Sequence, residues 1–221
     1  TGSEDALPDL PFVLPVVTRV DASDGMGHTY TTHYDYEGGR YDAPTKEFRG
    51  FRHVDATDTE GLVSHHWFLQ AADTKGRVET QFTTNFQENQ RFSEVDNEYL
   101  TTTPYPGVTF TSLNHQDVRE YNGDSTFRES HTWFYFDQYG NLISKAEIGE
   151  DPQTGDERQT TYVYAVNETE WIVNALSEIH VHEGTHSTNG PIFSRRFFYY
   201  DGNLSYTWDA TGTYWVPAIP V

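Results

Sequence analysis

The sequence predicts an all-β protein, an array of antiparallel β-hairpins that form one extended, curved sheet. No stretch of about ten residues spaces its apolar side chains at the 3.6-residue period of a helix. Turn residues recur at intervals of roughly ten to twenty residues, as they do in folds made only of sheet. Trp, Tyr and Phe supply 15% of a chain whose hydrophobic content is 35%. Such rings suit the half-buried, pleated surface of a strand.

Thr29–Val54 is the clearest hairpin segment. Its two halves are rich in Tyr, Thr and Phe and flank a turn that contains Gly38 and Gly39, and a second turn begins at Asp42. We expect Asp35 and Asp42 to fix these turns together with the glycines. An Asp side chain can accept hydrogen bonds from the backbone two residues on, and Gly adopts a positive φ without strain.

Similar aromatic–aspartate–turn units recur at Tyr135–Leu142 and Tyr199–Leu204. A single hairpin of this kind cannot bury its aromatic face alone, so neighbouring hairpins must pack edge to edge. The recurrence therefore predicts a repeat-built protein whose turn residues have a structural role. In these two units the expected turn residues are Asp137, Gly140, Asn141, Asp201, Gly202 and Asn203.

The division of the chain follows its composition. Residues 1–11 are acidic and contain proline, which predicts an N-terminal arm or linker. Residues 12–216 are predicted to form the β domain, and residues 217–221 a C-terminal tail. Phe12–Val20 is expected to be an edge strand, because Pro15 has no N–H group to donate to a neighbouring strand.

The remaining elements are predicted in order from their turn signals. Asp55–Gly61 is expected to be a turn, and Asn122-Gly123 is the strongest short hairpin signal in the chain. Trp171–Leu176 allows a short helical turn as an alternative to a strand. The other strands are predicted at Leu62–Ala71, Glu94–Tyr105, Val108–Tyr121, Ser125–Phe136, Leu142–Ile148, Gln159–Val166, Trp171–Val181, Ile192–Tyr200, Leu204–Trp208 and Tyr214–Val216.

The charge of the chain disfavours two classes of partner. The formal net charge is −20 at pH 7, with 34 acidic residues against 14 basic ones. Such a chain repels phosphate backbones and anionic lipid, so we expect no nucleic-acid partner. No run approaches the roughly eighteen apolar residues of a membrane span, so this segment is not expected to insert into a membrane. Because the chain begins at Thr1 and not Met, we expect a processed or excised segment of a larger polypeptide.

No cofactor is predicted. Cysteine is absent, which rules out disulfides and thiolate metal sites within the chain. Asp55–Gly61 has some features of a calcium loop but lacks the full acidic ladder of an EF-hand. The best candidate metal ligands are His180, His182 and His186. His180 and His182 would share one face of a strand, and His186 could return from the following turn, although exposed polar residues on a wet face are the more common outcome.

A resemblance to a known family rests on two segments. Tyr34–Asp42 (YDYEGGRYD) followed by Glu47–Phe51 (EFRGF) closely resembles a hallmark of the YD-repeat, or Rhs-type, region in the B components of bacterial insecticidal toxin complexes. Phe136–Leu142 (FDQYGNL) resembles the Y-D-x-x-G-N-L core of the repeat, with Phe in place of the first Tyr. The likeness extends from about residue 12 to about residue 208.

The resemblance implies a strip of hairpins that coils, in complete members of the family, into a hollow shell around a C-terminal toxin. It implies a non-catalytic virulence protein that is secreted or held on the bacterial surface. The implied partners are other YD-repeat segments, of the same or a neighbouring chain, and an enclosed toxin domain. A complete shell needs several times this length, so the chain would form one stretch of the wall.

Two other functions remain open. An extracellular subunit could assemble into a filament or matrix through its open sheet edges. A carbohydrate-binding module could use tryptophans as stacking platforms. Glu168 and Glu170 share a parity beside one of these rings, but spacing along one strand does not set the separation that glycoside hydrolysis needs, so no enzyme is predicted. The tryptophans are Trp67, Trp133, Trp171, Trp208 and Trp215.

Overall fold

The structure, a computed structural model, describes residues 10–123, 126–150, 155–184 and 190–200. These ranges contain strands and turns and no helix, so the predicted all-β class is confirmed. No helix in the described part is long and apolar enough to cross a membrane. The strands are β1 (Arg19–Ser23), β2 (Thr29–Glu37), β3 (Tyr41–Asp42), β4 (Glu47–Phe48), β5 (His53–Thr57), β6 (Leu62–Phe68), β7 (Val78–Asn85), β8 (Arg91–Tyr105), β9 (Val108–Tyr121), β10 (Phe127–Phe136), β11 (Leu142–Ile148), β12 (Arg158–Asn167), β13 (Ile172–Glu183) and β14 (Ile192–Phe197).

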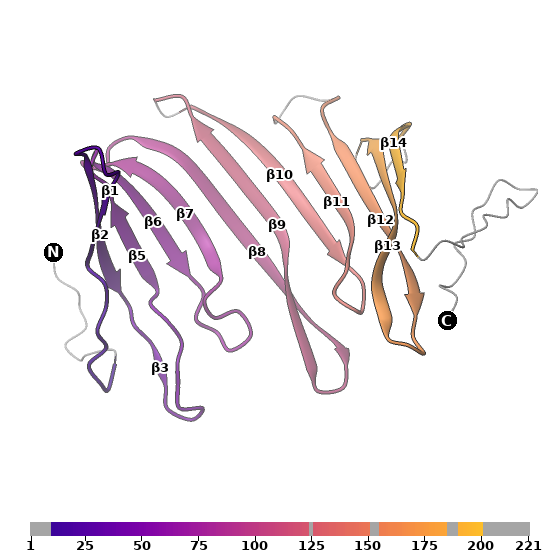
Figure 1. Cartoon of the computed structure of the whole chain (residues 1–221), viewed down its shortest axis with the longest axis horizontal. Coiled ribbons are helices and arrows are strands. Elements are labelled where there is room, and N and C mark those ends of the chain that lie inside the picture. Colours follow the sequence, from indigo (N-terminus) through magenta and orange to yellow (C-terminus); the bar gives the residue numbers. More distant parts are fainter. Residues whose placement is uncertain (1–9, 124–125, 151–154, 185–189, 201–221) are drawn as a thin grey trace, which may run out of the picture. The chain divides into compact units, whose positions relative to one another are not determined.

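The strands pair almost entirely in chain order. Among the described residues, the main sheet has 12 strands in the order β1-β2-β5-β6-β7-β8-β9-β10-β11-β12-β13-β14, and its first and last strands are not paired with each other. The remaining strands, β3 and β4, pair with each other as a small hairpin that extends beyond the ends of β2 and β5 (Figure 1). Each strand between β1 and β14 in this order hydrogen-bonds to the strand before it and the strand after it, which is the predicted array of antiparallel hairpins.

The chain forms two compact units. Of the described residues, the first unit takes those within 1–101 and 116–129, and the second takes those within 102–115 and 130–221. Within the first unit, β1, β2, β5, β6 and β7 are adjoining antiparallel strands (Figure 1). Within the second unit, β11, β12, β13 and β14 pair in the same manner. The predicted bounds of a single domain at 12–216 stay a prediction, because 201–221 lie outside the described residues.

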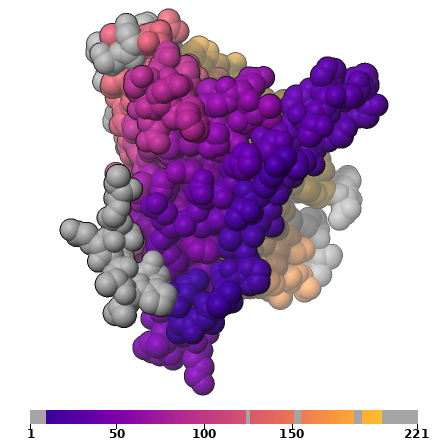
Figure 2. Space-filling view, turned by 90° about the vertical axis from the view of Figure 1, so that its left-hand side faces the viewer, coloured from indigo at the N-terminus to yellow at the C-terminus, as the bar shows by residue number. Residues whose placement is uncertain are grey.

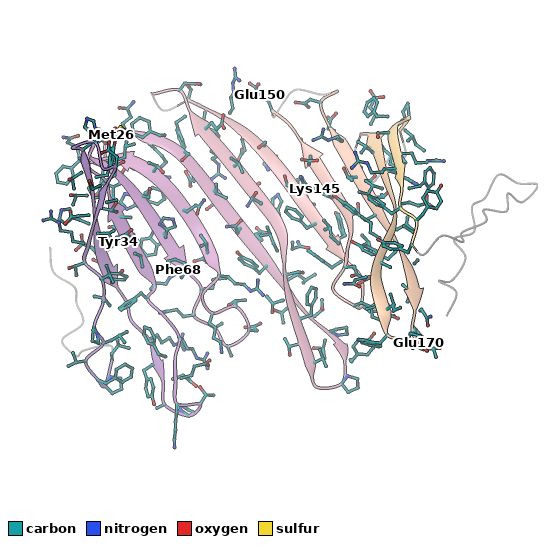
Figure 3. The ribbon with its side chains drawn as sticks, viewed as in Figure 1. Met26, Tyr34, Phe68, Lys145, Glu150 and Glu170 are labelled. Carbon is teal, nitrogen blue, oxygen red and sulfur yellow. The ribbon has the colours of Figure 1, made fainter. Side chains whose placement is uncertain are left out.

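Each unit hides little apolar surface. Among the described residues the buried hydrophobic side chains are Val63, Ala146 and Ala165. Most other side chains of the sheet, polar ones included, are half-buried. Examples are Tyr34 in the first unit and Lys145 in the second, both labelled in Figure 3. Rings stacked across neighbouring strands, and ion pairs beside them, therefore cover much of the sheet surface.

The bounds of two predicted elements differ from those in the structure, because pairing with neighbouring strands determines where a strand begins and ends. The predicted strand Phe12–Val20 is replaced by β1, which starts at Arg19 and pairs with β2 around a turn at Asp24. Residues 13–18 have strand-like composition but no strand assignment, and Val13 is 94% exposed. The predicted turn at Asp55–Gly61 starts three residues later, because β5 continues to Thr57 opposite β2 and β6.

The alternative helical turn at Trp171–Leu176 is not formed. Trp171 has a positive φ of 55° and ends the turn between β12 and β13, and Ile172 begins β13. The predicted strands Leu204–Trp208 and Tyr214–Val216 lie outside the described residues.

Candidate functional site

The predicted turn residues at Asp137 form a tight, side-chain-locked hairpin between β10 and β11. Oδ1 of Asp137 accepts hydrogen bonds from the backbone N–H groups of Tyr139 and Asn141, both at 2.9 Å. The Asn141 side chain donates to Oδ2 of Asp137 at 2.9 Å and to the carbonyl of Val173 at 2.8 Å. Gly140 has a φ of 86°, which a residue with a side chain adopts only with strain.

The same turn recurs at two aspartates in the first unit. Oδ1 of Asp58 accepts from the N–H groups of Glu60 and Leu62, both at 2.9 Å. Oδ1 of Asp24 accepts from the N–H groups of Met26 at 2.7 Å and His28 at 3.2 Å. These turns share the order Asp-x-x-Gly, in which the glycine has a positive φ. A repeated local device therefore joins successive strands.

The turn between β2 and β5 is fixed by close packing. Gly38 has a φ of 64°, and a Cβ atom there would lie 2.7 Å from Cβ of Arg52. Gly39 is buried, and a Cβ atom there would approach Leu10 at 3.1 Å. Asp42 accepts hydrogen bonds from Thr45, chiefly from its hydroxyl, and these bonds lower the pKa of Asp42.

Not every predicted turn residue lies in a turn. Asp35 is inside β2, where its Cα is paired with that of Asp55. Asp42 ends β3 and also lies 3.0 Å from the Arg49 guanidinium, which is 9% exposed. The predicted turn at Asp201-Gly202-Asn203 lies outside the described residues.

A cluster of His53, Asp55 and His65 occupies one face of β5 and β6 in the first unit. Its ligand-bearing atoms all lie within 4.8 Å of one another. The strand register explains the cluster, because Asp55 is paired with His65 and His53 with Trp67. Oδ1 of Asp55 is 2.8 Å from Nε2 of His53 and 2.6 Å from Nδ1 of His65. We call these residues the His–Asp–His cluster.

A row of stacked rings holds the two histidines of the cluster in place. His53 stacks on Trp67 with a centroid separation of 4.1 Å and an interplanar angle of 12°. His65 stacks on Phe82 at 4.5 Å, and the guanidinium of Arg91 lies 4.0 Å from the Phe82 centroid. The imidazole rings therefore have little freedom to rotate, which preorganises their nitrogen atoms.

The second unit contains a ring stack of the same composition, formed by His115, His131 and Trp133. His115 lies 4.2 Å from Trp133 and 5.9 Å from His131, measured between centroids. The corresponding distances in the first unit are 4.1 and 5.9 Å. In the sequence, both stacks show the order His-x-Asp followed by His-x-Trp. The hairpin repeat thus carries specific side chains as well as turns.

The predicted metal ligands His180 and His182 lie on the same face of β13. Nε2 of His180 is 2.7 Å from Oε2 of Glu178, and the two imidazole centroids are 6.1 Å apart. Among the described residues these histidines do not join a group of three close ligand atoms. His186 lies outside the described residues, so metal binding by this set stays a prediction.

A charged network in the first unit surrounds Arg119 of β9. Its guanidinium lies 2.6 Å from Asp96, 2.7 Å from Glu129 and 3.3 Å from Glu94. Burial lowers the pKa of Arg119, but the hydrogen bonds to Asp96 and Glu129 outweigh it and raise the pKa overall. Tyr121 donates to Glu94 at 2.7 Å. This network joins β8, β9 and β10 within the unit.

Sequence reasoning missed the His–Asp–His cluster. It treated His65 with His66 and correctly placed these adjacent side chains on opposite faces, since His65 stacks on Phe82 while His66 stacks on Phe68. It placed Asp55 in a turn. The only signal was the order His-x-Asp followed by His-x-Trp, and its meaning depends on the strand register.

The described strands form an antiparallel sheet of serial hairpins, joined in part by aspartate turns. Comparisons with known proteins add a family resemblance. Residues 2–81 match the family model of the insecticide toxin TcdB middle/N-terminal region. The resemblance to the B components of insecticidal toxin complexes is therefore confirmed. No match is found among curated protein sequences.

Solved structures share the fold. The crystal structure of TcdB2-TccC3-Cdc42 superposes with a TM-score of 0.56 at 10% identity, over 72% of this chain and 12% of that one. The crystal structure of TcdB2-TccC3 gives a TM-score of 0.55 at 12% identity, over 74% of this chain and 13% of that one. This chain therefore spans about an eighth of the length of the chains it matches.

Proposed function

We propose that this chain is a non-catalytic stretch of a YD-repeat shell wall in the B component of an insecticidal toxin complex. The observation that carries the proposal is the strand order, in which 12 strands of the described part pair serially and the first does not pair with the last. A sheet of this kind grows by adding hairpins along the chain, as solenoid proteins grow by adding repeats. Such growth produces a wall, and the family match at residues 2–81 supports a toxin-complex wall.

The burial pattern supports the same function. Val63, Ala146 and Ala165 are the buried hydrophobic residues of the described part, whereas most ring and polar side chains are half-buried. A wall needs strong bonding in the plane of the sheet and tolerates faces that remain partly wet. The aspartate turns and the Arg119 network supply that in-plane bonding.

The proposal includes the setting of the protein. The chain would belong to a larger polypeptide that a bacterium secretes or displays on its surface. Its partners would be neighbouring YD-repeat segments and an enclosed toxin domain. The similar crystal structures contain TcdB2 together with TccC3, which supports a partner of that kind. The net charge of −20 favours neither nucleic acid nor an anionic membrane surface as a partner.

The edge at β1 favours a second candidate function, self-assembly through strand addition. All five residues of β1 are exposed, and the indigo part of the chain lies on the surface of the face that Figure 2 shows. An exposed edge offers unpaired backbone groups to another strand. In a shell wall the preceding segment of the polypeptide would occupy this edge, whereas in a filament a second copy would occupy it.

Cysteine labelling tests the shell wall, because the chain has no cysteine of its own. Thr80 and Gln81 are adjacent, half-buried residues of β7 whose side chains face opposite sides of the sheet. We would introduce Thr80→Cys and Gln81→Cys separately, label with a maleimide too large to enter a closed shell, and read the modified peptide by mass spectrometry. The label is applied to the isolated chain and to the complete toxin complex.

A shell wall has an inner and an outer face, so both positions should react in the isolated chain and only one in the complete complex. Labelling after denaturation is the control for intrinsic reactivity. Equal labelling of both positions in the complete complex contradicts the wall. Equal labelling together with polymers of the isolated chain, seen by sedimentation, supports the self-assembling subunit instead.

A further inference from the structure

The central atoms of the His–Asp–His cluster face one another without hydrogen bonds. Nε2 of His53 and Oδ1 of Asp55 are both buried, and neither has a hydrogen-bond partner of acceptable geometry. They are nevertheless 2.8 Å apart, and Nδ1 of His65 is 2.6 Å from the same oxygen. Buried polar atoms without partners are costly and are rare in folded proteins. Their convergence on one point therefore indicates a missing binding partner.

The outward nitrogen atoms of both histidines have neighbours of their own. Nε2 of His65 is 3.0 Å from the hydroxyl of Thr84, which is 3% exposed. Nδ1 of His53 lies 3.7 Å from a carboxylate oxygen of Glu37. In metal sites a ligating histidine directs its second nitrogen to a hydroxyl, carbonyl or carboxylate, which fixes the ring and the tautomer. His65 has this arrangement, whereas the Glu37 carboxylate is too far from His53 for a direct hydrogen bond.

The surroundings of the cluster carry excess negative charge. Asp35 of β2 is paired in register with Asp55, which places two carboxylates directly opposite each other on one face. Like charges in this position destabilise a sheet unless a cation lies nearby. Arg52, the residue before β5, is bound to Glu79 and to the carbonyl of Phe68 at 2.6 Å. A bound cation would balance the two aspartates.

The donor set identifies the class of cation. Ca²⁺ and Mg²⁺ prefer sites made entirely of oxygen ligands, whereas imidazole nitrogen suits Zn²⁺ and its neighbours among the transition metals. Two imidazole nitrogens and one carboxylate oxygen match a tetrahedral zinc site whose fourth position holds water. Around an ion at about 2.0 Å, the ligand atoms would separate to roughly 3.3 Å. A small rotation of the Asp55 carboxylate supplies that opening.

We infer that His53, Asp55 and His65 bind one divalent transition-metal ion, with Zn²⁺ as the best match. The ion ties β5 to β6 and balances the Asp35–Asp55 pair. This role is separate from the shell-wall proposal, since a sheet can form a wall with or without the ion, and metal binding can occur outside a shell.

Metal titration of the tag-free, full 221-residue chain tests the inference. After treatment with a chelator, Zn²⁺ alone is titrated by calorimetry, and Co²⁺ is followed by the visible absorption that reports its coordination. The variants are His65→Phe, which keeps a ring for stacking on Phe82, and Asp55→Asn, which keeps the shape of the carboxylate. The matched control is His66→Phe, the same change one residue away on the opposite face.

At the His–Asp–His cluster, the wild type and His66→Phe should bind metal more tightly than His65→Phe and Asp55→Asn, by about 100-fold or more. His115, Asp117 and His131 form a second group of possible ligands that all these proteins share, so the difference between the proteins reports on the cluster. Thr84→Val, which removes only the neighbour of His65 Nε2, should weaken binding by roughly 10-fold. Circular dichroism verifies the fold of each variant, and Asp55→Asn decides the question if His65→Phe does not fold. Equal binding by the wild type and Asp55→Asn, or no binding by the wild type, overturns the inference.

Discussion

Single aspartate side chains determine the geometry of the hairpin turns. Asp24, Asp58 and Asp137 each accept two backbone hydrogen bonds with one carboxylate oxygen, and each is followed three residues later by a glycine of positive φ. The carboxylate satisfies N–H groups that the turn would otherwise leave without partners. The turn at Asp137 was predicted from the sequence. The turn at Asp58 was placed approximately, because its flanking residues lack the aromatic pattern.

Replacing Asp137 with Ala should lower the free energy of unfolding by about 1–2 kcal/mol, because two backbone N–H groups lose a charged acceptor. Asp137→Asn keeps an oxygen at the same place and should cost less. Chemical denaturation measured side by side checks this order. If Asn and Ala cost the same, the two accepted hydrogen bonds do not determine the turn.

Gly38 and Gly50 form a matched pair for the packing of the turn between β2 and β5. Both have positive φ, 64° and 87°, but only at Gly38 would a Cβ atom meet another residue, at 2.7 Å from Arg52. Gly50→Ala should cost about 1 kcal/mol of backbone strain. Gly38→Ala should cost a further 1–3 kcal/mol, roughly, from overpacking. Thermal unfolding compares the two, and equal losses contradict the contact.

At the scale of the strand, the sequence pattern predicts some strand bounds correctly and misplaces others, and the reason can be identified in each case. The predicted bounds Val108–Tyr121 and Leu142–Ile148 are those of β9 and β11, because clear turn residues precede and follow both. β1 was misplaced, since the pairing with β2 selected Arg19–Ser23 over the more apolar Phe12–Val20. Composition indicates that a segment can be a strand, whereas its partner decides which residues are paired.

Arg119 tests how far one side chain of β9 stabilises its neighbours. Arg119→Ala would remove the cation that bonds Asp96 and Glu129 and would leave Glu94 paired with Arg91, so we expect a loss of about 1–3 kcal/mol in unfolding free energy. Arg119→Lys keeps the charge but not the several donors of the guanidinium, and should recover part of the loss. Urea denaturation measures all three proteins. A wild-type midpoint for Arg119→Ala contradicts the role of the network.

At the scale of the whole molecule, the long-range arrangement depends on register, which local pattern does not contain. The serial hairpin order could be predicted because repeated turns imply it. The His–Asp–His cluster could not, because His53 and His65 come together only when Asp55 is paired with His65. A shift of one residue would direct these side chains to opposite faces. His180 and His182 could be predicted to lie on one face because both belong to the same strand.

The acidic chain should lose stability as the pH falls. Burial raises the pKa of Glu147, but Lys145 and Arg158 outweigh it and lower the pKa overall, and Thr45 lowers that of Asp42. Because the folded pKa values lie below the ordinary 4.5 and 3.8, this stability is present above those values and is lost below them. Urea midpoints between about pH 7 and about pH 3 measure the loss.

Glu147→Gln should show a smaller change of midpoint across this range than the wild type, because it removes one group whose pKa is lowered on folding. Glu120→Gln, the same substitution at an exposed position of β9, is the matched control. If the unfolding midpoints of the two variants depend on pH in the same way, the lowered pKa of Glu147 does not contribute to the pH dependence of stability.

Electron cryomicroscopy of the native particle that contains this chain tests the shell wall most directly. We expect the strands of the main sheet, which leaves out β3 and β4, to form part of a continuous wall, with one face toward an enclosed space and the other toward solvent. A filament of repeated copies, or a particle in which solvent bathes both faces of the sheet, would contradict the proposed function.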